Sequence, residues 1–244
     1  GRTFPNIKVF IDGRTEVYGA QFFKTYQKVW QSGNKKIFDE LARKHRITGA
    51  LLNDAHQQVP SKVVRLFYGL NNWKLVYFDY DALIFLKNTP ENQLVIARHA
   101  IDLAKWRPPR MDLQRLGPKR IYPFPHIDRA RVLIMLKLDG PARKELNEAL
   151  KIAPEAAEIY QLLGDIEARR KEYRKAFEHF RVAVMLNSGD HRSRLRLAWA
   201  YERLKDYPNA LKAYERLLAD KPKDAKIAEK VRKLKERLRK QAHA

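Results

Sequence analysis

The 244-residue sequence contains no cysteine. It therefore holds no disulfide, no zinc–thiolate site and no cysteine nucleophile, although this absence does not identify a cellular compartment. No apolar run approaches the roughly 18–20 residues that a membrane-spanning helix needs, and the sequence shows no signal peptide. Acidic residues are scarce, since 28 Asp and Glu stand against 50 Lys and Arg, for a net charge of +22. Such a surface favours anionic partners or simply keeps the protein solvated.

The sequence also lacks the motifs that accompany common enzyme sites. We find no GxGxxG, no GxxxxGK[ST] and no GxSxG, and none of the seven histidines has HExxH spacing. We therefore expect no catalytic residue, no metal site and no cofactor. One alternative stays open: Asp12 and Asp54 each end an expected strand, and acids at neighbouring strand ends can form an enzyme site. Asp79 and Asp81 are interpreted as turn residues that cap the backbone.

The N-terminal part of the chain, 1–105, predicts a small α/β domain. Short runs rich in Val, Ile, Tyr and Phe predict strands, and apolar residues three or four apart predict helices. The expected strands are 7–12, 48–54, 74–78 and 82–87, and the expected helices are 20–30, 34–46, 60–70 and 91–106. Because the first strands are too apolar to have a wet face, we expect a sheet that is at least partly parallel and covered by helices. The last two strands are expected to form a hairpin.

A regular repeat occupies the second half of the sequence. Ala142, Ala176 and Ala210 are equally spaced and mark its period. Bulky residues stand four positions after these alanines, at Leu146, Phe180 and Tyr214. Small residues stand twelve positions before them, at Ala130, Gly164 and Ala198. The spacing of small and bulky residues, with a period of about 34 positions, resembles the tetratricopeptide repeat, a stack of helical hairpins, over residues 123–222. Three positions depart from the repeat's usual residues: Glu167 replaces a bulky residue, Arg194 an aromatic residue and Arg129 a leucine.

The fold class expected is thus an α/β small-sheet domain followed by an all-α tetratricopeptide-repeat solenoid. The expected domains are 1–105 for the sheet domain, 106–122 for a proline-rich connector, 123–222 for three repeats and 223–244 for a basic capping helix. The capping helix has one apolar stripe, which we expect to pack on the last repeat, and its other face is rich in Lys and Arg and is expected to face water.

The resemblance implies that the first helix of each hairpin lines a concave surface that binds peptides or proteins. The residues expected there are Gln161, Asp165, Arg169, Arg192, Arg196, Trp199 and Arg203. Arginines beside a tryptophan suit an acidic or carboxylate-bearing ligand. The alternative is that the arginines only solvate a helix and that Trp199 belongs to the core. With three repeats, a structural or self-association role is also open.

A second resemblance covers residues 7–88. It is carried by Asp12, Gly13, Arg14, Tyr18, Gly19, Trp73 and Asp79. These residues resemble a soluble region that follows the last membrane span in bacterial multi-pass proteins of the protein-mannosyltransferase type, often with tetratricopeptide repeats behind it. The catalytic acids of that family lie in the membrane part, so no residue here inherits them.

Together these patterns predict a non-catalytic, extracytoplasmic (periplasmic) region of a bacterial membrane protein. Because the sequence begins with Gly1 rather than Met, we expect a fragment or a processed product. Its expected partner is a protein or peptide of acidic character, with an anionic membrane surface as a second partner. A basic nucleic-acid-binding protein is the alternative from another class, argued from the charge of +22 and the C-terminal Lys/Arg helix.

Overall fold

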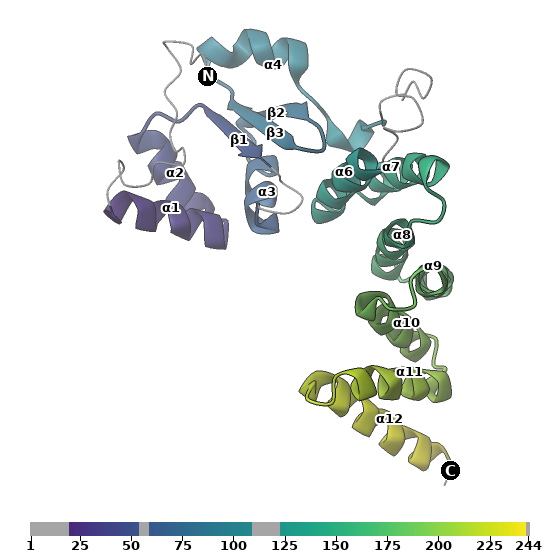
Figure 1. Ribbon diagram of the computed structural model, residues 1–244. Coiled ribbons are helices and arrows are strands. Elements are labelled where there is room, and N and C mark those ends of the chain that lie inside the picture. The colour runs from purple at the N-terminus through teal and green to yellow at the C-terminus, as the bar shows by residue number, and fades with distance from the viewer. Residues whose placement is uncertain (1–19, 54–58, 109–122, 243–244) are drawn as a thin grey trace. The chain divides into compact units, whose positions relative to one another are not determined.

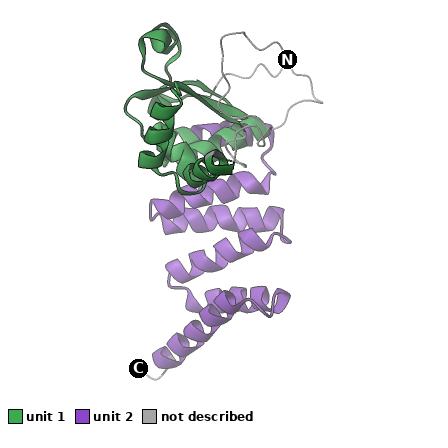
Figure 2. Ribbon diagram, turned by 90° about the vertical axis from the view of Figure 1, so that its left-hand side faces the viewer, with its two compact units in different colours: residues 1–109, 124–142 green, residues 110–123, 143–244 purple. Residues whose placement is uncertain are grey.

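The computed structural model describes residues 20–53, 59–108 and 123–242. The chain divides into two compact units (Figure 2): residues 1–109 with 124–142, and residues 110–123 with 143–244. The strand expected at 7–12, Asp12 and Asp54 lie outside the described residues, as does most of the expected connector. The expected domain boundaries stay a prediction. None of the described helices is long and apolar enough to cross a lipid bilayer.

The first unit contains a three-stranded sheet and short helices (Figure 1). Its elements in chain order are α1 (Ala20–Ser32), α2 (Lys35–Lys44), β1 (Gly49–Asn53), α3 (Ser61–Tyr68), β2 (Trp73–Phe78), β3 (Ala82–Lys87), α4 (Gln93–His99) and α6 (Phe124–Met135). The predicted start of α2 is confirmed, because the Asn34 side chain accepts the backbone N–H of Ile37 at 3.2 Å.

The sheet order is β1-β3-β2, and every pairing among the described strands is antiparallel. The predicted β2–β3 hairpin is confirmed, and Asp79 Oδ1 accepts the N–H groups of Asp81 and Ala82 at 2.8 Å, as expected of a turn residue. The partly parallel sheet is wrong for these strands. Because β3 lies between β1 and β2, it forms hydrogen bonds with one edge of each strand and runs antiparallel to both.

The helix expected over 91–106 is also wrong in its second half. After α4, the backbone N–H of Ile101 donates to the carbonyl of Leu75 on β2, so the chain leaves the helix to pair with the sheet. The side chain of Asp102 then caps a short 3₁₀ turn, Leu103–Lys105. Consequently Leu103 is buried, whereas Leu94 is 61% exposed.

Four buried aromatic rings form the centre of the first unit. The ring of Phe67 lies 4.8 Å from Phe38, 5.6 Å from Trp73 and 5.6 Å from Phe85, measured between centroids. Pairs at these separations add about 0.5–1.5 kcal/mol each to the free energy gained by burial. The cluster joins α2, α3, β2 and β3 into one core.

The second unit is a succession of helical hairpins, as the repeat in the sequence predicts. Its elements are α7 (Asp139–Ile152), which begins in the first unit, then α8 (Ala157–Arg169), α9 (Tyr173–Leu186), α10 (His191–Arg203), α11 (Tyr207–Asp220) and α12 (Ala225–Ala242). The backbone conformation repeats as well. Lys171 and Lys205 lie one repeat period apart, in the turns after α8 and α10, and both have φ of 64°.

The small and bulky positions of the repeat meet inside each hairpin. Gly164 on α8 faces Phe180 on α9 so closely that a Cβ atom built on Gly164 would overlap the Phe180 ring. In the next hairpin, Ala198 and Tyr214 share a buried cluster. The expected capping helix is also observed, because Ile227, Val231 and Leu234 of α12 are buried in that same cluster.

We predict that Gly164→Ala destabilises the chain by about 1–3 kcal/mol, because the added methyl group overlaps the Phe180 ring. Urea unfolding followed by circular dichroism measures this change. Gly140→Ala is the matched control, since a Cβ atom there meets no atom within 4 Å. Equal unfolding midpoints for the two variants would contradict the close helix contact.

Candidate functional site: the first-helix face and the α10–α12 groove

The residues expected to bind a partner lie on α8 and α10, the first helices of two successive hairpins; we call their shared surface the first-helix face. Asp165 and Arg196 form a two-pronged ion pair across it, with both N–O distances at 2.6 Å. Gln161 donates to Asp190 at 2.9 Å, and Asp190 in turn caps α10 through the N–H of Ser193. The structure therefore brings α8 and α10 together through the predicted residues themselves.

The hydrogen bonds at the start of α10 also set the ionisation of its cap. Burial alone would raise the pKa of Asp190, but hydrogen bonds from Ser193 and Arg192 outweigh burial and lower it. Asp190 is thus held as the carboxylate that fixes both Gln161 and the first turn of α10.

Three arginines of the predicted set have exposed side chains: Arg169, Arg192 and Arg203. Leu195, between Arg192 and Arg196 on α10, is 37% exposed. The sequence analysis missed Leu195, because leucine at helical spacing is typical of a core residue. The first-helix face therefore combines charged groups with an apolar side chain.

Trp199 is only half-buried, so neither of the two interpretations from the sequence describes it fully. One part of its ring packs against a cluster that includes Ala176 and Phe180. The ring centroids of Trp199 and Tyr173 lie 5.8 Å apart in an edge-to-face arrangement. The Arg203 guanidinium lies over both rings, 5.0 Å from the centroid of Tyr173 and 5.5 Å from that of Trp199.

Two departures from the repeat pattern are explained by ion pairs. Glu167 is buried and accepts a hydrogen bond from Arg143 of α7. Arg194 pairs with Asp220 at the end of α11 at 2.6 Å. In both places an ionic contact between helices replaces the bulky residue that the repeat usually carries there. The sequence shows the departures but gives no signal for the partners.

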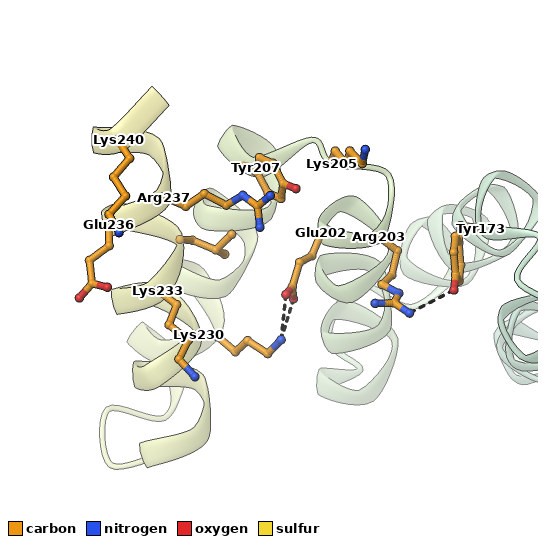
Figure 3. Close-up of a pocket in the computed structure, with 11 residues that line it drawn as sticks. Tyr173, Glu202, Arg203, Lys205, Tyr207, Lys230, Lys233, Glu236, Arg237 and Lys240 are labelled. Carbon is orange, nitrogen blue, oxygen red and sulfur yellow. Dashed lines mark hydrogen bonds and ion pairs between the residues drawn. The ribbon is translucent and has the colours of Figure 1, made fainter. Parts of the chain in front are cut away.

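A groove of about 660 Å³ lies between α10 and α12 (Figure 3). Its lining includes two tyrosines, two glutamates and six basic residues. The basic residues are Arg203, Lys205, Lys230, Lys233, Arg237 and Lys240. Only Arg203 belongs to the set predicted from the sequence. The repeat period is the signal that could have predicted the others. Arg237 follows Arg203 by one full period, and Tyr207 follows Tyr173 by the same interval.

Within residues 20–53, 59–108 and 123–242, no group of three or more His, Asp or Glu side chains is arranged to hold a metal ion. The alternative enzyme site at Asp12 and Asp54 lies outside those ranges. Cations, aromatic rings and exposed polar groups can bind an anionic or amphipathic chain.

Comparison with known proteins identifies the repeats. Two family models described as tetratricopeptide repeat match residues 142–191 and 168–234. Residues 142–234 are therefore tetratricopeptide repeats, and the matched region takes in the second helix of the first predicted unit but not α6. A comparison with curated proteins found no match.

Solved structures with a similar arrangement include several tetratricopeptide-repeat domains. The Sgt2 domain from Aspergillus fumigatus is 19% identical, with 52% of this chain and 89% of that chain covered and a TM-score of 0.46. The first repeat domain of human RPAP3 is 18% identical, with 49% of this chain and 94% of that chain covered and a TM-score of 0.44. The first such domain of Spaghetti, bound to the HSP90 peptide SRMEEVD, is 19% identical, with 46% of this chain and 92% of that chain covered and a TM-score of 0.43.

The ion pair of Glu167 lies beside a titratable group whose pH response can be measured. Burial is the main cause that lowers the pKa of His179 below 6.5; Glu167 opposes this and Arg143 reinforces it. Because the unfolded chain then binds the proton more readily, the free energy of unfolding should decrease as the pH falls through about 6.5.

We predict that His179→Gln removes part of this decrease between pH 7 and pH 5. Urea titrations at several pH values measure it, and His99→Gln, at an exposed position on α4, is the control. The assignment to His179 is refuted if both variants retain the full pH dependence of the parent.

Proposed function

We propose that the repeats form a protein–protein interaction module that docks a partner polypeptide on the first-helix face. The observation that carries this proposal is the pair of contacts that joins α8 to α10, Asp165–Arg196 and Gln161–Asp190. They hold two successive first helices together while the side chains of Arg192 and Leu195 remain exposed.

Such a surface is well suited to binding because little of it must be ordered when a partner arrives. Immobilising a flexible side chain on binding costs roughly 0.5–1.5 kcal/mol. Here Arg196 is already fixed by two hydrogen bonds, and Trp199 and Arg203 are held by Tyr173. A partner therefore meets prearranged polar groups beside the exposed Leu195.

Site-directed photo-cross-linking in the native cells tests this proposal. Benzoylphenylalanine at Leu195 should give a discrete protein adduct on irradiation. The same group at Lys212, an exposed position on the second helix α11, should give none. Arg192→Glu should reduce the Leu195 adduct by reversing the neighbouring charge. Adducts at Lys212 but not at Leu195 would contradict docking on the first-helix face.

We further propose that this region is the extracytoplasmic part of a bacterial membrane protein similar to protein-mannosyltransferases. The support is the resemblance over residues 7–88, in which Trp73 opens the hairpin and Asp79 caps its turn. The net charge of +22 would suit a position beside anionic headgroups.

This proposal predicts that the native reading frame encodes several hydrophobic spans upstream of residue 1. It also predicts that a fluorescent tag or a protease-cleavable tag at the C-terminus lies on the extracytoplasmic side of the membrane. The measurement is the sequence of the complete reading frame together with protease protection of intact spheroplasts. A frame without such spans would exclude the membrane context while leaving the interaction module untouched.

A further inference from the structure

We infer that the groove between α10 and α12 binds an acidic segment of a partner protein, through two arginines that tyrosines hold in place. The inference rests on the proposed interaction module and assigns it a second contact site and a ligand chemistry. Figure 3 shows Lys230, Lys233, Arg237 and Lys240 on α12, and Arg203 on α10 with its guanidinium turned toward Tyr173.

The two arginines occupy equivalent positions in successive repeats. Arg203 lies over the ring of Tyr173 at 5.0 Å, and Arg237 lies over the ring of Tyr207 at 4.3 Å. Stacking against a ring fixes the plane of a guanidinium group, and Arg203 is fixed further because its Nη2 donates to the Tyr173 hydroxyl at 3.1 Å. The remaining N–H donors along the edge of each guanidinium are available. Those edge donors match a carboxylate in a two-pronged arrangement. The repeat thus places two such arginines one hairpin apart.

The acidic residues of the groove are already engaged. Both carboxylate oxygens of Glu202 accept from Lys230 at 2.9 Å, and Glu236 pairs with Arg232 at 2.7 Å. Arg232 and Lys233 likewise hold Glu229 as a carboxylate and lower its pKa to about 2.

Four cations of the groove lack an acidic partner within the described part of the chain. Among the described residues, no carboxylate lies within 4.0 Å of Arg203, Lys205, Arg237 or Lys240. This differs from Arg196 on the first-helix face, whose charge Asp165 balances. An incoming acidic group would therefore gain more at the α10–α12 groove.

The cations of α12 form a continuous stripe. Lys226, Lys230, Lys233, Arg237 and Lys240 follow one another at intervals of three or four residues, which places them on one side of the helix. Like charges at this spacing repel one another and destabilise an isolated helix. Glu202 and Glu229 offset this repulsion at Lys230 and Lys233, whereas Arg237 and Lys240 have no such acid among the described residues. A bound acidic segment would relieve that repulsion.

The rest of the lining favours a polypeptide over a nucleic acid. Glu202 and Glu236 interrupt the positive surface, so its unpaired cations are not spaced as evenly as the charges of a phosphate backbone. A peptide can place its acids opposite the arginines and an apolar side chain against the partly exposed ring of Tyr173. The volume of about 660 Å³ is within the range of ligand-binding clefts.

Fluorescence anisotropy with the full chain tests the inference, using labelled hexaglutamate as the probe and hexaglutamine as its uncharged counterpart. Hexaglutamate should bind and hexaglutamine should not. Arg203→Ala and Arg237→Ala should each weaken binding about tenfold, as expected when a charge-assisted hydrogen bond is lost. Arg237→Lys should also weaken it, because lysine keeps the charge but not the planar donors.

Arg216→Ala on α11 is the matched control and should bind like the parent, since it removes the same charge outside the groove. Circular dichroism verifies that each variant is folded. Unchanged affinity of Arg237→Ala overturns the inference, and so does full affinity of Arg237→Lys, which would reduce the site to net charge.

Two further probes separate the possible ligands. An oligothymidylate of about 12 nucleotides and vesicles containing an anionic phospholipid should bind more weakly than hexaglutamate at the same salt concentration. Tighter binding of either probe, lost in Arg237→Ala, overturns the assignment to an acidic polypeptide. A positive cross-link at Leu195 together with no hexaglutamate binding would refute the groove site alone and leave the interaction module standing.

Discussion

The contact of a small residue with a bulky ring inside each hairpin is the constraint on which the second unit depends. Gly164 against Phe180 leaves no room for even a methyl group, and Ala198 with Tyr214 occupies the same place one period later. Because these contacts recur once in every period, residues separated by that interval come to equivalent positions on successive helices. The pairing of Arg203 with Tyr173 and of Arg237 with Tyr207 follows from this register.

The distribution of acids then decides which cations can bind a ligand. Asp165 balances Arg196 between α8 and α10, and Glu167 balances Arg143 between α7 and α8. These pairs join helices to one another. Lys230 and Glu202 likewise join α12 to α10. Among the described residues, however, Arg203, Lys205, Arg237 and Lys240 have no carboxylate within 4.0 Å, and these four cations form the surface to which we assign the acidic ligand. A net charge of +22 alone could not have located it.

The sequence predicted the repeats well because their signal is a fixed spacing of side-chain sizes, which a single chain displays directly. It could not predict the direction of β1 relative to β3, since apolar alternation is the same in parallel and antiparallel strands. It also placed a helix through 100–105, where a hydrogen bond from Ile101 to Leu75 competes with helical pairing. The site residues stay a prediction. Of that set, only Arg203 lines the proposed groove, and Arg237 could have been found only by treating α12 as the first helix of a further repeat.

Nitrogen-15 spectra of the arginine Nε–H groups, recorded during titration of the full chain with hexaglutamate, test the central claim most directly. The account predicts that the Nε–H signals of Arg203 and Arg237 shift together and saturate at one peptide concentration, while the signal of Arg196 stays in place because Asp165 already binds it. Shifts at Arg196 without shifts at Arg203 and Arg237 would contradict the account.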